Sequence, residues 1–264
     1  MIMNPIFPGA LAIILYLLGT GAQIVTQGNA KRFINCVSVS AVIVHGFSNY
    51  LAFFTEIGLN LSIYTMLSVT ALAVVTIILF SNIHRPVESF FVVIFPIAAI
   101  SILLQISSER AYLPRDDLSA GLLLHIFLSV LASGLLTVLA IQALILSFCN
   151  YALRHRKLAF VKKFPPLETI EKLLFEMLAA GLIVLSLSIL TGFIYLEDIF
   201  NPGLLHHTLI TLAAWLVFSV LLWGRIRKGW RGRTAARWAL TGFGLLIVGY
   251  FGSKLVLEVI VRTS

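Results

Sequence analysis

Residues Ser119–Phe148 read SAGLLLHIFLSVLASGLLTVLAIQALILSF, an apolar run without Asp, Glu, Lys or Arg. A transmembrane helix needs about 20 mostly apolar residues, so this run is long enough to cross a bilayer with some tilt. Similar runs predict seven further spans, and the full set is Phe7–Thr26, Phe33–Phe54, Leu61–Phe80, Phe90–Ile106, Ser119–Phe148, Leu173–Leu196, Leu205–Trp223 and Arg237–Glu258. The predicted fold is an all-α, polytopic transmembrane helical bundle of about eight spans, with residues 1–264 as a single transmembrane domain.

The composition excludes several other classes of protein. Apolar residues make up 59% of the 264 residues, charged residues make up 11%, and the mean hydropathy is +1.01. A soluble domain has about 25% charged and about 45–50% apolar residues. A soluble globular fold, a disordered chain and a secreted disulfide scaffold are therefore excluded.

The basic residues orient the predicted bundle. Of the 19 Lys and Arg residues, only Arg110, Arg115, Lys254 and Arg262 fall on one side of the spans, and the others cluster on the opposite side. Cytoplasmic loops carry an excess of Lys and Arg, so both termini are predicted on the outer, periplasmic side of a bacterial inner membrane. The net charge of +8 then follows from topology, and no surface of interleaved aromatic and basic residues suggests nucleic acid.

Four histidines are predicted in the outer leaflet, where ionisable residues are costly and so candidates for function. They are His45, His125, His206 and His207. A haem iron takes one or two axial imidazoles, and a flat apolar macrocycle suits an apolar helix wall. Zinc and copper suit the site less well because no Asp, Glu or Cys clusters with these histidines. Structural histidines that hydrogen-bond within the bundle are the other interpretation.

Small polar residues flank these histidines at helical spacing. Ser129, Ser133 and Thr137 follow His125 at intervals of four, as Thr211 and Trp215 follow His207. The stripe after His125 is typical either of a face lining a cofactor groove or of a close helix–helix contact. Ser48 and Asn49 follow His45, and either could orient its ring. Common hydrolase, nucleotide-binding and zincin motifs are absent, so a binding factor is expected rather than an enzyme.

Several short motifs along the second half of the chain carry a resemblance to a known family. They include Pro165-Pro166-Leu167, Thr191-Gly192-Phe193, His206-His207-Thr208, Ala214-Trp215, Leu222-Trp223-Gly224, Trp230-Arg231-Gly232-Arg233 and Tyr250-Phe251-Gly252-Ser253. In these motifs the chain resembles the cytochrome c assembly family of haem-handling membrane proteins, the CcsA/ResC/HemX group, and especially its short inner-membrane members. The resemblance is strongest over residues 120–256.

The resemblance implies a haem-binding protein that supports cytochrome c assembly. The family's haem-binding histidines near the outer side fall on His125 and His206, which become the expected iron ligands, with His45 third and His207 as a substitute. Trp215 is expected beside the cofactor. The expected cofactor is non-covalent, b-type haem, and the expected partners are haem, the lipid bilayer and other cytochrome c assembly membrane proteins.

Two departures from the family pattern narrow this expectation. Full haem-delivery proteins carry a tryptophan-rich WGxxWxWD segment where this chain has Glu197–Gly203, and they end with a histidine where this chain ends Val261-Arg262-Thr263-Ser264. The chain is therefore expected to hold or pass haem rather than attach it to a protein. The alternative is a transporter or an accessory scaffold of the same fold that no longer binds haem. An electron-transferring b-type cytochrome ranks lowest, because no second histidine pair lies on the cytoplasmic side.

Overall fold

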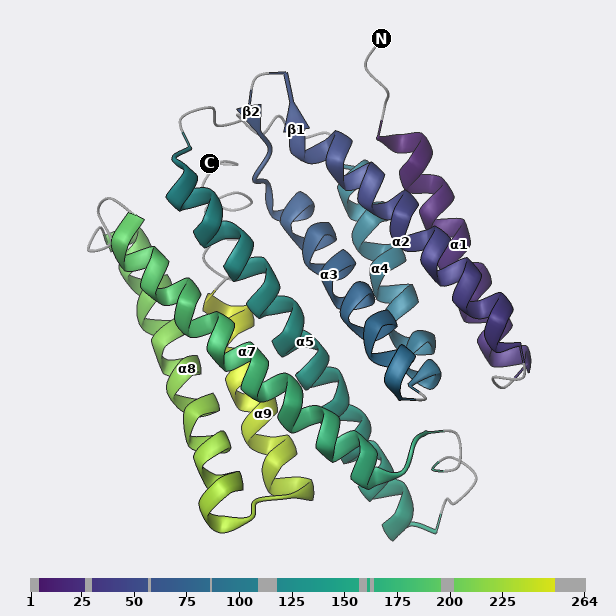
Figure 1. Cartoon of the computed structure of the whole chain (residues 1–264), viewed down its shortest axis with the longest axis vertical. Helices are drawn as coiled ribbons and strands as arrows, with labels where there is room; N and C mark the ends of the chain where they lie inside the picture. The colour runs from purple at the N-terminus through teal and green to yellow at the C-terminus, as the bar shows by residue number, and fades with distance from the viewer. Residues whose placement is uncertain are drawn as a thin grey trace. The chain divides into compact units, whose positions relative to one another are not determined.

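The computed structural model describes residues 5–26, 30–56, 58–85, 87–108, 118–156, 161, 164–195 and 202–249. Their α-helices are α1 (Ile6–Thr26), α2 (Lys31–Phe53), α3 (Ile63–His84), α4 (Phe91–Ile106), α5 (Ala120–Arg154), α7 (Leu167–Tyr195), α8 (Pro202–Lys228) and α9 (Gly232–Ile247). A short 3-10 helix η1 (Glu88–Phe90) precedes α4, and strands β1 (Phe54–Thr55) and β2 (Gly58–Leu59) form a small hairpin between α2 and α3 (Figure 1).

The eight predicted spans correspond to these eight helices. Seven of the helices in the described residues are long and apolar enough to cross a membrane, which confirms a polytopic helical membrane protein. The described part of α9 has 16 residues, and the predicted continuation of this span to Glu258 lies outside the described residues. The helix α4 continues through Pro96, the residue at which the missing backbone N–H favours a kink.

The helices fall into two compact units, residues 1–118 and 119–264. In the first unit, α1 and α3 each pack against both α2 and α4, which closes a ring of four antiparallel helices (Figure 1). Its interior holds Tyr16, Phe91 and Phe95; the Phe95 ring lies 5.2 Å from the Tyr16 ring and 4.7 Å from the Phe91 ring between centroids. The prediction of a single domain remains a prediction.

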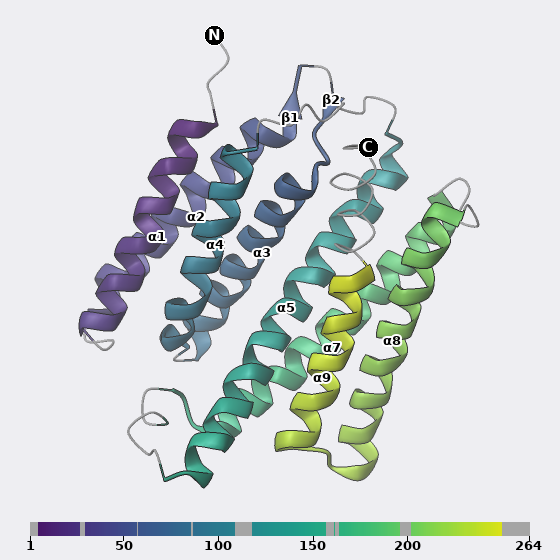
Figure 2. The same ribbon diagram turned by 180° about the vertical axis from the view of Figure 1, so that it is seen from behind.

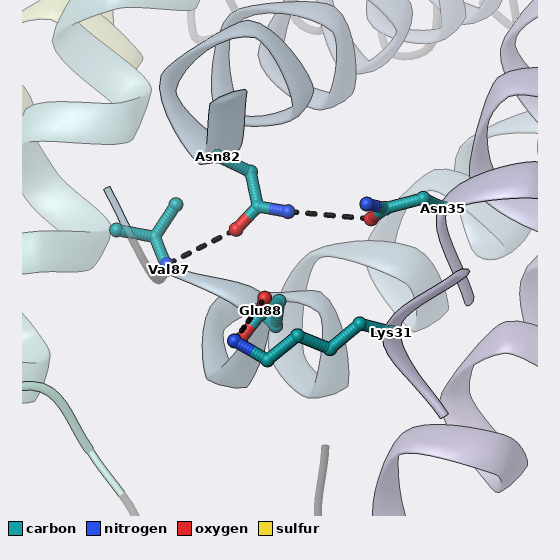
Figure 3. Close-up of polar contacts among 5 residues, drawn as sticks. All are labelled: Lys31, Asn35, Asn82, Val87 and Glu88. Atoms are coloured by element: carbon teal, nitrogen blue, oxygen red, sulfur yellow. Dashed lines mark hydrogen bonds and ion pairs between the residues drawn. The ribbon is translucent and has the colours of Figure 1, made fainter. Parts of the chain in front are cut away.

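Polar contacts close one end of the first unit (Figure 3). Lys31 at the start of α2 forms an ion pair of 3.1 Å with Glu88 of η1. The Asn82 amide nitrogen donates to the Asn35 side-chain oxygen, and its own side-chain oxygen accepts from the Val87 backbone N–H. These contacts tie α2, α3 and the connection to α4 together.

The second unit repeats the ring arrangement with different helices. Here α5 and α8 each pack against both α7 and α9, and Figure 2 shows α9 between α5 and α8. Glycines permit the close approaches: a Cβ at Gly181 would lie 2.8 Å from Leu136, and one at Gly242 would lie 2.7 Å from Phe218. Small residues at helix crossings let backbones approach closely, which is how helices associate in lipid.

In the second unit the helices extend beyond the predicted spans at one end. The helices α5 and α8 continue past the predicted ends, Phe148 and Trp223, to Arg154 and Lys228. The helices α7 and α9 begin before the predicted starts, Leu173 and Arg237, at Leu167 and Gly232. Hydropathy detects only the part of a helix inside hydrocarbon, so the charged turns outside it were predicted as loops.

Every lysine and arginine among the described residues lies at one end of its own unit. In the first unit these are Lys31, Arg32 and Arg85, near the ends of α1 and α3 and the starts of α2 and α4. In the second they are Arg154, Arg156, Lys172, Arg225, Arg227, Lys228, Arg231, Arg233 and Arg237, near the ends of α5 and α8 and the starts of α7 and α9. The same grouping underlies the predicted orientation.

The orientation predicts the side on which each terminus lies. Alkaline phosphatase fused after Ser264 is expected to be active, because its disulfides form only on the oxidising, outer side of the membrane, and green fluorescent protein at the same position is expected to be dark. Fusion of the same reporters after Arg231 should give the reverse pattern. A fluorescent fusion at Ser264 would contradict the predicted orientation.

The packing of α1 predicts a position-dependent effect of glycine substitution. A Cβ at Gly19 would lie 2.8 Å from the ring of Phe95, whereas Gly21, in the same helix, has no atom within 4 Å of that position. Overpacking a filled interior costs about 1–3 kcal/mol, so Gly19→Leu should lower the unfolding temperature of the detergent-purified protein. Gly21→Leu is the matched control and should leave it unchanged. Equal effects of the two substitutions would contradict this packing.

Candidate histidine sites

His125 lies in the second turn of α5. The helix begins at a capped residue, because the Ser119 hydroxyl accepts the Leu122 backbone N–H. The half-buried His125 ring meets α7, where its Nδ1 lies 2.9 Å from the carbonyl oxygen of Ser188. A carbonyl only accepts, so Nδ1 carries the proton and the neutral ring has its lone pair on Nε2.

The tautomer of His125 suits a metal ligand. Ligating histidines characteristically donate their other ring N–H to a carbonyl or carboxylate, which fixes the ring and directs the lone pair to the metal. No hydrogen-bond partner of Nε2 is found in the part of the chain that the structure describes. This ring can therefore offer one nitrogen to an iron.

Hydroxyl groups hold the two helices together around His125. The Ser129 hydroxyl donates to the His125 backbone carbonyl. Its proton is therefore used, and the Ser188 hydroxyl, 2.7 Å away, must donate to the Ser129 oxygen. The Thr191 hydroxyl lies 2.9 Å from two acceptors, the Leu187 carbonyl and the Ser188 carbonyl that His125 also uses. Ser129 thus joins α5 to α7 beside the ring, while Ser133 and Thr137, further along the predicted stripe, bond to carbonyls of their own helix.

Trp215 lies at nearly the same height as His125. Its indole N–H donates to the Ser186 hydroxyl of α7 at 2.8 Å, two residues from the Ser188 carbonyl that His125 contacts. His207 lies about two turns before Trp215 on α8, and Thr211 between them bonds to the His207 carbonyl. With a rise of about 1.5 Å per residue, His207 lies roughly 12 Å nearer the end of the unit than Trp215.

His206 and His207 lie near the start of α8. The His206 side chain is exposed and that of His207 is half-buried. The structure thus places three candidate histidines toward one end of the second unit, but it separates His125 from the other two in height. Among the described residues, no group of three or more His, Cys, Asp or Glu side chains could hold a metal ion together.

His45 belongs to the first unit and is fully buried, with 0% of its surface exposed. The Ser68 hydroxyl donates to the side-chain oxygen of Asn49 at 2.9 Å, so it accepts from His45 Nε2–H at 3.0 Å. Nδ1 therefore has the lone pair and accepts from the Tyr16 hydroxyl at 3.1 Å. Both ring nitrogens therefore have hydrogen-bond partners. In this chain of bonds Tyr16 donates to His45, His45 donates to Ser68, and Ser68 donates to Asn49.

Sequence reasoning found the histidines but missed their partners. Asn49 contacts His45 only through Ser68, and Ser48 bonds instead to the carbonyl of Pro5. Tyr16 and Ser68 lie on other helices, so spacing along α2 could not identify them. The partner of His125 is a backbone carbonyl, for which no residue type gives a signal.

The chain is similar in sequence to known membrane proteins. The family model described as "Cytochrome C assembly protein" matches residues 8–261. The chain is 30% identical over 203 residues to the inner membrane protein YpjD of Escherichia coli K12, covering 77% of each chain. It is 28% identical over 96 residues to the cytochrome c biogenesis protein CcsA of Prochlorococcus marinus, covering 36% of this chain and 30% of that protein. No solved structure matches it.

The buried hydrogen bonds of His45 predict a stability effect. Tyr16→Phe removes the hydroxyl that donates to Nδ1 and leaves that buried acceptor unpaired. An unpaired buried acceptor costs about 1–3 kcal/mol, so the unfolding temperature should fall. Tyr50→Phe is the matched control on α2, because the Tyr50 side chain is exposed. An unchanged unfolding temperature in Tyr16→Phe would contradict the assigned direction of these bonds.

Proposed function

This chain belongs to the cytochrome c assembly protein family, and from that premise we propose that it binds and handles haem in support of cytochrome c assembly. It is a multi-pass helical protein of the inner membrane, as its apolar helices and its similarity to YpjD indicate. Its proposed partners are haem, the bilayer and other cytochrome c assembly membrane proteins. The named activity of the CcsA relative, cytochrome c biogenesis, supports the same process.

The hydrogen bond of His125 is the single observation that carries the proposal. Because Nδ1 donates to the Ser188 carbonyl, the lone pair is on Nε2, which is the form of imidazole that binds iron. Haem, when bound, would supply an iron that accepts one or two such nitrogens. The residues therefore fit a non-covalent, b-type haem held by His125.

We rank the candidates for a second iron ligand by their position relative to His125. His206 is the first choice and His207 a substitute, because both lie in the same unit as His125, although nearer its end. Trp215, at the height of His125, provides a half-buried aromatic wall. His45 lies in the other unit and is the third candidate iron ligand by itself; it would have to release the Tyr16 hydroxyl before it could bind iron.

The alternative function is a transporter or accessory scaffold that has kept the fold without haem. It is favoured by the absence of tryptophan from Glu197–Gly203, where full haem-delivery proteins carry WGxxWxWD. This alternative predicts a colourless protein and a replaceable His125. Both functions are compatible with a binding or assembly role rather than catalysis.

The absorption spectrum of the detergent-purified protein distinguishes the two functions. We expect a b-type spectrum, oxidised and reduced, with about one haem per chain by the pyridine haemochrome assay. His125→Ala should remove most of that absorbance, because it removes the iron-binding nitrogen. His155→Ala is the matched control, since His155 follows the opposite end of the same helix and is exposed. A wild-type protein that is colourless and takes up no added haem would overturn the proposal.

A further inference from the structure

A surface of basic residues lies where α8 ends and α9 begins. We call Arg227, Lys228, Arg231, Arg233 and Arg237 the basic surface, and all five side chains are exposed. No carboxylate of the described residues lies within salt-bridge distance of any of them. In the first unit, by contrast, Lys31 is paired with Glu88 (Figure 3). The positive charge of the basic surface is therefore not neutralised by the described part of the protein.

The turn that carries these residues is held by several hydrogen bonds. The Trp230 N–H donates to the Gly224 carbonyl, and the Arg225 guanidinium donates to the Trp230 carbonyl. The Gly232 N–H donates to Glu171 on α7 at 2.7 Å, so the carboxylate that reaches this turn is bound to backbone. Gly229 and Gly232 have φ of 65° and 54°, values that side-chain-bearing residues rarely adopt.

Aromatic rings fix the inner side of the turn. The Trp230 ring packs directly on Gly224, where a Cβ would clash with the indole, and it stacks on Trp238 at 5.3 Å between ring centroids. Arg225 lies 4.6 Å above the Phe175 ring of α7. Because these contacts already fix the backbone of the turn, binding of an anion here costs little conformational entropy of the backbone.

The neighbouring apolar residues place the basic surface beside lipid. Ile226, between Arg225 and Arg227 on α8, is 73% exposed, and Trp223, two residues before Arg225, is 51% exposed. Exposed apolar side chains on a spanning helix face lipid, and tryptophan prefers the level of the headgroups. The Lys228 ammonium lies 5.4 Å from the centre of the Trp223 ring, which brings positive charge to that level.

We propose that the basic surface binds the headgroup of an anionic phospholipid such as phosphatidylglycerol. Guanidinium groups match the oxygens of a phosphate diester, and clustered Lys and Arg beside a spanning helix attract anionic lipid. Ile226 and Trp223 offer the adjoining acyl chains an apolar contact, which nucleic acid or a free phosphate would leave unused. This site is independent of haem and involves none of the candidate ligands.

Tryptophan fluorescence provides the test, since the chain has 4 Trp and all except Trp215 lie in or beside this turn. The purified whole protein is titrated in detergent with dibrominated phosphatidylglycerol and, separately, with dibrominated phosphatidylcholine. We expect the anionic lipid to quench at about tenfold lower concentration, because several basic groups act on one headgroup. Equal quenching by the two lipids would overturn the proposal, as would full competition by inorganic phosphate at matched ionic strength.

Matched variants test whether the preference for phosphatidylglycerol depends on the basic surface. Arg231→Gln/Arg233→Gln/Arg237→Gln should abolish the preference for phosphatidylglycerol, whereas Lys31→Gln/Arg32→Gln, at the basic end of the first unit, should retain it. Each single substitution is measured as well, so that poor folding of the triple variant does not prevent the test. A preference that survives in the triple variant, or that is undiminished in all three single variants if the triple variant does not fold, would overturn the assignment.

Discussion

The hydrocarbon of a membrane offers no water, so a backbone N–H or C=O inside it that lacks a partner within the protein costs several kcal/mol. Helices satisfy the backbone, and hydroxyls on the spanning helices satisfy themselves by donating to a carbonyl one turn earlier, as Ser38, Thr70 and Thr137 do. What remains are the few side chains that must bond across helices. The contacts of His45, His125 and Trp215 are of this kind, and they join helices at the positions where function is proposed.

The same constraint has opposite consequences for the two histidines. His45 is completely enclosed, and Tyr16 and Ser68 occupy both its nitrogens, so its ring acts as a link between three helices. His125 is only half-buried, and the Ser188 carbonyl occupies one nitrogen. Its backbone partner fixes the tautomer without using the second nitrogen. The difference in available lone pairs, rather than depth in the membrane, ranks His125 above His45 as an iron ligand.

Sequence predicted the spans well because hydropathy reports directly on the hydrocarbon that a helix must cross. It failed where helices leave that layer: Arg225 and Lys228 were predicted in a loop but lie on α8. It also identified His45 and His125 without their bonding partners, since Tyr16, Ser68 and the Ser188 carbonyl come from other helices. Tertiary partners depend on which helix faces meet, and the periodicity of one helix cannot specify this.

The helix α8 separates the two proposed sites by the thickness of a membrane. From His206 to Lys228 it rises about 33 Å at about 1.5 Å per residue, close to the roughly 30 Å of a bilayer's hydrocarbon. His206 and the basic surface therefore lie at opposite membrane interfaces of the same unit. His125 contacts α7 within one turn of the Trp215 contact, so it lies further inward than His207 and still well short of the basic turn. His125 and the basic surface are therefore separate along the membrane normal, and the packing of α8 against α7 and α9 connects the two ends of the unit.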